Sequence, residues 1–196
     1  MEAIRHTKVY RSRHGMEGMM DNSVTTAFLQ CRTVRIGSYK VVPREPVVIS
    51  PHGIRISVPC VDDAPHCCAT ETECIPVTLD MKEIVKALIY FGRGRGIPVI
   101  FLYTEPYVGP RLRTTLNMTD SQRAYFDPMS SDETQRWITL LPEVLQDETK
   151  SALKSIFGSL DNVLNELDKE KANDILVKTS PKVAVNLHQH SAHHQH

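Results

Sequence analysis

The residues with the most obvious chemical potential in this 196-residue chain are four cysteines and a histidine between positions 60 and 74. Cysteine thiolates and histidine imidazoles are the ligands that structural zinc prefers, usually in a tetrahedral set of four. The spacing argues against zinc, because a zinc knuckle usually begins with two cysteines two to four residues apart. We therefore expect ordinary loop thiols and no cofactor. The weak candidate ligands are Cys60, Cys67, Cys74 and His66.

A cysteine hydrolase is the enzyme alternative, and it needs a thiolate within hydrogen-bond reach of a histidine base. Cys60 or Cys67 could meet His52 or His66 in space, but five cysteines and nine histidines make chance pairs common. No surrounding motif supports any one pair. The sequence therefore predicts a chain that is not an enzyme.

A second group of candidate residues consists of arginines in glycine-rich or proline-rich loops. Residues 92–96 alternate glycine with arginine, which predicts a hairpin loop. Arg93 and Arg95 at its tip could contact phosphate or an acidic peptide, and Arg111 and Arg113 could complete the patch. Solvated loop side chains are the alternative. The loop lacks the Lys-Ser/Thr ending of a nucleotide-binding P-loop.

The overall charge restricts the class of partner. The 23 basic and 23 acidic residues cancel, so a generally basic nucleic-acid binder is excluded and only a local patch could bind nucleic acid or phosphoinositide. No apolar run is long enough to span a membrane, and the first residues have no signal-peptide core. With an odd number of cysteines, we expect a reducing compartment, nuclear or cytoplasmic.

These side chains must be positioned by short strands, because β-forming residues recur in brief runs separated by turn residues. Residues 54–58 alternate strictly, which predicts that Ile54, Ile56 and Val58 face the core while Arg55 and Ser57 face water. Asp80 and Glu83 form a possible capping pair, which favours a helical turn at the start of the next strand. The predicted strands are residues 27–36, 39–49 with two prolines interrupting, 54–58, 75–79, 84–91, 97–103 and 137–141.

The end of the chain has a helical period. Residues 147–157 predict one amphipathic helix, and a second apolar stripe runs from residue 160 to residue 176. This stripe either packs on the core or forms a partner or homodimer surface, with Leu160, Leu164 and Leu167 as its binding candidates.

Short antiparallel strands followed by helices predict an α+β fold. We expect a mainly antiparallel, pleckstrin-homology-like bent sheet or barrel that is capped by C-terminal helices. The predicted divisions are a disordered leader at 1–26, the domain at 27–157, a helical extension at 158–178 and a disordered, His-rich tail at 179–196. An open sheet edge is expected near residues 43–49.

Three segments resemble a known family: residues 34–50, 98–103 and 123–143. They are similar to the non-catalytic region before the peptidase domain in the large sentrin-specific (SUMO-specific) proteases, the subgroup that trims SUMO chains. The resemblance covers most of residues 31–178. The peptidase of that family places a Gln a few residues before its Cys, whereas Gln30 directly precedes Cys31 here. The resemblance therefore implies an accessory domain, and no catalytic residue carries over.

Together these observations predict a non-enzymatic protein-interaction or scaffolding module whose partners belong to the SUMO pathway. Two alternatives stay open: a fragment of a SUMO-specific cysteine protease, or a phosphoinositide- or nucleic-acid-binding domain. The expected binding surfaces are the open sheet edge and the arginine hairpin.

Overall fold

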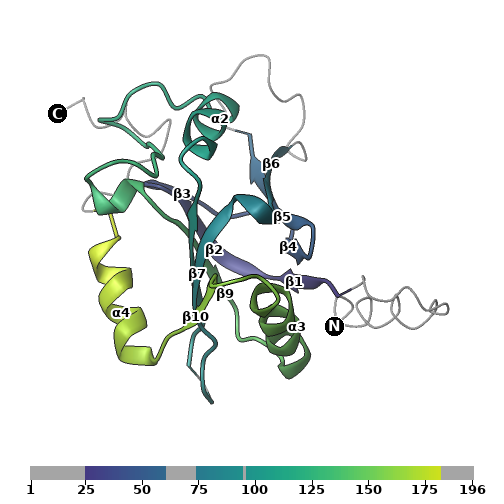
Figure 1. The fold of residues 1–196 in the computed structure, drawn as a ribbon. Coiled ribbons are helices and arrows are strands. Elements are labelled where there is room, and N and C mark those ends of the chain that lie inside the picture. The colour runs from purple at the N-terminus through teal and green to yellow at the C-terminus, as the bar shows by residue number, and fades with distance from the viewer. Residues whose placement is uncertain (1–24, 61–73, 95, 182–196) are drawn as a thin grey trace, which may run out of the picture.

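The computed structural model describes residues 25–60, 74–94 and 96–181, which form two sheets with helices at their margins (Figure 1). The strands are β1 (Ala27–Leu29), β2 (Cys31–Ile36), β3 (Tyr39–Val41), β4 (Val47–Ser50), β5 (Gly53–Pro59), β6 (Cys74–Asp80), β7 (Ile84–Tyr90), β8 (Val99–Thr104), β9 (Ile138–Pro142) and β10 (Leu164–Glu166). The helices are η2 (Met81–Glu83), α2 (Val108–Thr115), η3 (Glu133–Gln135), α3 (Asp147–Gly158) and α4 (Lys169–Lys178).

The strands divide into a four-stranded sheet, β1-β4-β5-β6, and a six-stranded sheet, β10-β7-β8-β9-β2-β3. Every pairing is antiparallel except that of β10 with β7. The chain passes from one sheet to the other three times: at Gln30 between β1 and β2, in the segment between β3 and β4, and at η2 between β6 and β7. The predicted α+β class with mainly antiparallel strands is confirmed, and the two sheets do not close into a barrel.

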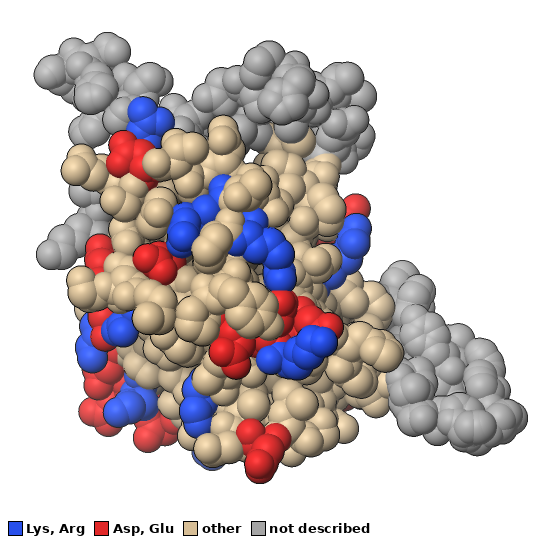
Figure 2. Space-filling view, turned by 45° about the horizontal axis from the view of Figure 1, so that its top comes forward, with Lys and Arg blue, Asp and Glu red and all other residues tan. Residues whose placement is uncertain are grey.

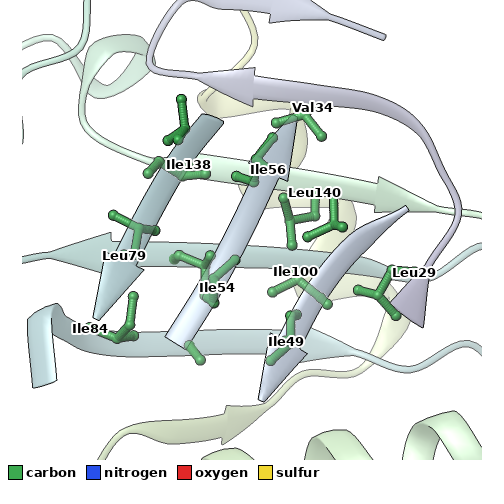
Figure 3. Close-up of a cluster of buried hydrophobic side chains, with 14 of the residues drawn as sticks. Leu29, Val34, Ile49, Ile54, Ile56, Leu79, Ile84, Ile100, Ile138 and Leu140 are labelled. Atoms are coloured by element: carbon green, nitrogen blue, oxygen red, sulfur yellow. The ribbon is translucent and has the colours of Figure 1, made fainter. Parts of the chain in front are cut away.

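The core lies between the two sheets, whose strands run across one another (Figure 3). Ile54 and Ile56 of β5 point toward Ile100 of β8 and Leu140 of β9, and each of these side chains is at most 2% exposed. Where two sheets pack face to face, the side chains that point toward the other sheet are buried. Their burial stabilises the domain mainly because it removes apolar surface from water. The predicted inward positions on β5 are therefore confirmed.

Ser57 is the exception on this strand, because it is 4% exposed rather than facing water. Its hydroxyl donates a hydrogen bond to Glu45 Oε1 at 3.1 Å, from the segment that links β3 to β4. Because this segment lies against β5, the buried hydroxyl has a hydrogen-bond partner. The alternation of apolar and polar residues along β5 does not predict that contact.

The helical turn expected before β7 is present. The Asp80 carboxylate accepts from the Lys82 backbone N–H at 3.0 Å, and Glu83 Oε1 accepts from the Asp80 backbone N–H at 2.9 Å. This reciprocal pair is a capping box around the single turn η2.

The continuous helical stripe predicted for residues 160–176 is wrong in its first half. Residues 164–166 form the strand β10, parallel to β7, and helix begins only at Lys169. The Ala87 N–H donates to Val163 O, and the Leu167 N–H donates to Ile89 O. These bonds use the free edge of β7, which the local period could not anticipate. The predicted boundary between residues 157 and 158 remains a prediction.

The open edge expected near residues 43–49 lies elsewhere. Strand β4 pairs with β1 on one side and β5 on the other, so Val47–Ser50 is inside its sheet. The neighbouring strand β3 is the terminal strand of the six-stranded sheet. The correction arises because residues 27–36 are two strands, one in each sheet, rather than one.

Helix α4 packs on the outer face of the six-stranded sheet, where Ala172 joins a second apolar cluster with Tyr90, Val99 and Phe101. No helix in the described part of the chain is both long and apolar enough to cross a bilayer. The predicted leader and tail fall almost entirely outside the described residues.

Candidate binding cleft

A cleft of about 1100 Å³ opens at the end of the β7–β8 hairpin, beside α3 and the start of α4. Its floor includes Tyr90 and Phe91, which are 9% and 6% exposed. Four cations and two carboxylates share the lining: Arg93, Lys150, Lys154, Lys169, Glu166 and Asp168. A cleft of this size with a positive excess can take an extended, anionic segment.

Two lysines of α3 join the helix to the hairpin. Lys150 Nζ donates to Gly92 O at 3.2 Å, and the Lys154 ammonium lies 5.1 Å from the centre of the Phe91 ring. Gly92 has a φ of +85°, a conformation that glycine adopts without strain. The turn is closed by the Gly96 N–H, which donates to Arg93 O at 2.7 Å. Arg93 itself is exposed at the rim.

The carboxylates limit what the cleft can bind. The Asp168 side chain accepts from the Lys171 N–H at 2.8 Å and caps α4, and Glu166 is exposed on β10. A ligand with closely spaced negative charges would be attracted by the cations but repelled by both carboxylates. The arrangement therefore favours a ligand with separated negative charges.

Arg111 does not join Arg93 in one patch, because the two lie at opposite ends of the β7–β8 pair. The register places Ile84 beside Thr104 at the α2 end and Tyr90 beside Val99 at the hairpin end. Arg111 donates to Glu83 through two nitrogens, at 2.6 and 2.9 Å, and to Thr78 O at 2.9 Å. Its guanidinium therefore attaches α2 to β6 and η2.

Arg113 is also engaged within the domain. It donates to Phe126 O at 2.9 Å, lies 3.8 Å from the Asp127 carboxylate and sits 5.0 Å from the centre of the Tyr125 ring. Figure 2 brings the α2 side of the molecule forward and shows basic and acidic side chains intermingled there. This face is not one continuous basic surface.

The three predicted leucines pack inward. Leu160 and Leu164 are half-buried against the main core, and Leu167 lies against the cluster under α4. These contacts agree with the packing alternative for Leu160 and Leu164, whereas Leu167 also lines the hairpin cleft, and a partner surface on this stripe stays a prediction.

The weak zinc candidates are only partly visible. Cys67, His66 and the hairpin residue Arg95 lie outside the described residues. Cys60 and Cys74 are half-buried near the facing ends of β5 and β6, where Pro59 pairs with Cys74. Within the described ranges, no group of three or more metal-ligating side chains comes together.

Cys31, the cysteine that directly follows Gln30, is buried in β2. Burial, and then the charge of Glu143, raises the pKa of Cys31 to about 12, although Arg32 opposes the shift. At pH 8 only about one thiol in ten thousand is then the reactive thiolate.

We expect iodoacetamide at pH 8 to leave Cys31 unmodified in the folded protein and to modify it fully in urea, with peptide mass spectrometry as the measurement. Rapid modification of Cys31 before unfolding would contradict this result.

Sequence reasoning missed the three lysines of the cleft. Lys150 and Lys154 are spaced i, i+4, which places them on one face of a helix and was a usable signal. Lys169 reaches the cleft only because β10 returns the chain to β7, so no local pattern marked it.

In the comparison with family models, the chain matches the SENP6/SENP7 PH-like domain over residues 25–184. Neither the curated proteins nor the solved structures include a match to this chain. The matching model describes a PH-like domain rather than a peptidase domain, as the three resembling segments implied. Because the match covers most of the sequence, the chain belongs to the SENP6/SENP7 PH-like domain family.

Proposed function

We propose that this domain is a non-catalytic accessory module that binds a partner protein of the SUMO pathway, in the nucleus or the cytoplasm. The observation that carries the proposal is the cleft at the β7–β8 hairpin, where four cations and two carboxylates surround a partly apolar floor. An extended protein segment with spaced acidic residues matches this pattern of charge.

The two carboxylates of the cleft, Glu166 and Asp168, favour a protein ligand over a ligand with many phosphate groups. Lipid headgroups and nucleic-acid backbones present closely spaced phosphates, which gain from an unmixed basic surface. A peptide can place a carboxylate near Lys154 or Arg93 and a donor near Glu166. Its apolar side chains can contact Leu167, which lines the same cleft.

The double variant Arg93→Ala/Lys154→Ala is expected to weaken binding of SUMO chains about tenfold and to lower the melting temperature by only about 1–4 °C, because Lys154 loses a cation–π contact with Phe91 worth about 0.5–1 kcal/mol. Each lost charge pair at a partly exposed cleft costs about 0.5–1 kcal/mol, and two together correspond to about one order of magnitude. Fluorescence anisotropy with labelled SUMO chains at two salt concentrations measures the effect.

The matched control is Arg55→Ala/Lys82→Ala, which removes two exposed cations outside this cleft. If both double variants weaken the binding of SUMO chains equally, the effect is one of general charge, and the cleft is not the binding site. Tight binding of phosphoinositide vesicles or oligonucleotides, lost in the cleft variant, would favour the polyphosphate alternative. SUMO-conjugate cleavage that thiol alkylation abolishes would contradict a non-catalytic role.

A further inference from the structure

Arg35 lies in the middle of β2 as a buried cation. The residue is 9% exposed, and its Nε and Nη1 atoms are buried with no hydrogen-bond partner in the part of the chain that the structure describes. No ion pair joins it to a carboxylate in the described ranges. Burial lowers the pKa of Arg35 from its ordinary value. An uncompensated buried charge is costly, so a carboxylate brought to this position would be strongly favoured.

The neighbours of Arg35 lie on the outer face of the six-stranded sheet. Val34 and Ile36 are fully buried in the main core, so the alternation of the strand turns Arg35 to the opposite face. The register places Lys40 of β3 on one side of Arg35 and Thr139 of β9 on the other. Lys40, Arg35 and Thr139 therefore form a row across β3, β2 and β9, and two of these three side chains are cations.

A second unpartnered donor lies nearby. Trp137 comes two residues before Thr139, which puts it on the same face and diagonally across from Arg35. Its indole Nε1 is also buried without a hydrogen-bond partner in the described structure. Trp137 packs its ring against Phe101 and Tyr103, which hold the indole in place.

The row ends at an open sheet edge. Strand β3 is the last strand of its sheet and pairs only with β2 among the described strands. Lys40 is exposed, and Val42, directly after the strand, is 63% exposed. A strand added to β3 would lie about 9–10 Å from β2, since neighbouring strands are about 4.8 Å apart. An arginine and a glutamate side chain together span about that distance.

We propose that the β3 edge accepts an extended strand of a partner protein and that Arg35 and Lys40 hold an acidic side chain of that strand. A peptide satisfies both features of the site, because its backbone pairs with the edge while its carboxylate meets the guanidinium. The site lies at the opposite edge of the sheet from β10 and the hairpin cleft, and it does not depend on that cleft.

The single tryptophan of the chain reports on this site, since its indole N–H gives one signal in a ¹H–¹⁵N NMR spectrum. The probe is a blocked peptide of alternating Thr and Glu, titrated beside the same peptide with Gln for Glu. We expect the Glu peptide to shift the indole signal saturably and the Gln peptide to bind at least tenfold more weakly. Equal binding of both peptides overturns the role of Arg35. Acetate or inorganic phosphate matching the Glu peptide would show a small-anion site and overturn strand addition.

Two variants separate a binding role from a structural one. Arg35→Met is expected to raise the melting temperature by about 3 °C and to abolish the Glu-peptide shift, because it removes an uncompensated charge. Lys40→Glu places a carboxylate opposite Arg35 within the chain, so it should also raise the melting temperature and block the peptide. Arg32→Met, an exposed arginine on the same strand, is the control and should change neither property.

Arg35→Met could instead lower the melting temperature or fail to fold, while Lys40→Glu does not raise the melting temperature. That result would mean that the charge of Arg35 already has a partner, and it would overturn the proposal. Lys40→Gln removes the like charge opposite Arg35 but adds no carboxylate, so it should raise the melting temperature less than Lys40→Glu does.

Discussion

Replacing Gly37 by alanine is expected to destabilise the domain by about 3 kcal/mol, because the added methyl group meets both an unfavourable backbone conformation and neighbouring backbone atoms. Gly37 has a φ of +64°, which costs an alanine about 1 kcal/mol. The added Cβ would also overlap the Tyr125 carbonyl and approach the Phe126 Cα to 2.7 Å. These are backbone atoms, so no side chain can rotate away, and the overlap adds about 1–3 kcal/mol.

The consequence extends beyond the β2–β3 turn, because this turn attaches a long loop to the sheet. The Gly37 N–H donates to Trp137 O at 2.9 Å, and the Ser38 N–H donates to Tyr125 O at 3.0 Å. Displacing the loop strains both bonds. Thermal unfolding should show a melting temperature lower by about 6–12 °C, at about 2–4 °C per kcal/mol.

Gly94→Ala provides the matched control. Gly94 has a similar φ of +57°, but a Cβ there would meet no atom within 4 Å. We expect a loss of only about 1 kcal/mol, from the backbone conformation alone. Equal losses at Gly37 and Gly94 would show that φ alone accounts for the effect and that the approach to Tyr125 does not matter.

Arg111→Met is expected to cost about 2–3 kcal/mol at neutral pH, because it leaves the Glu83 carboxylate buried without its main partner. Glu83 is 6% exposed and accepts two of the three hydrogen bonds that Arg111 donates. Breaking a fully buried pair typically costs about 3–5 kcal/mol. The value here is lower because the Arg111 side chain is 42% exposed. Urea unfolding of both proteins at pH 7 measures the difference.

The same pair predicts a pH dependence. The Arg111 hydrogen bond, with help from the Asp80 N–H, holds the pKa of Glu83 below its ordinary value despite burial. A lowered folded-state pKa contributes stability that is complete above the unfolded pKa of about 4.3 and lost as the pH falls through the folded value. Stabilities of the parent and Arg111→Met should therefore converge in acid. A difference that stays constant down to pH 2 would contradict the assignment.

Arg123→Met is the control for this pair, because Arg123 is exposed and should change stability by less than about 0.5 kcal/mol.

The strands and the capping turn could be predicted because they depend on residues close in the sequence. The alternation of Ile54, Ile56 and Val58 requires only that one face of a strand be buried, and all three are buried. The Asp80–Glu83 capping box joins residues three apart. These features need no knowledge of which strand lies alongside.

The candidate sites were less accessible to sequence reasoning. Arg93 was identified and lies in the cleft, but Arg111 and Arg113 bond within the domain. Arg35 has no unusual sequence context, and its lack of a partner became visible only once its neighbours on β3 and β9 were known.

What the sequence by itself determined about this protein is its class, its short antiparallel strands, the turn before β7 and its likeness to one accessory domain. Only the tertiary structure decided that β1 pairs with β4, that residues 164–166 extend the sheet beside β7 and that β3 is the open edge. The physical reason is that local patterns record which face of an element is buried. Strand pairing and the partners of a buried charge depend on segments that are distant in the chain and meet only when it folds.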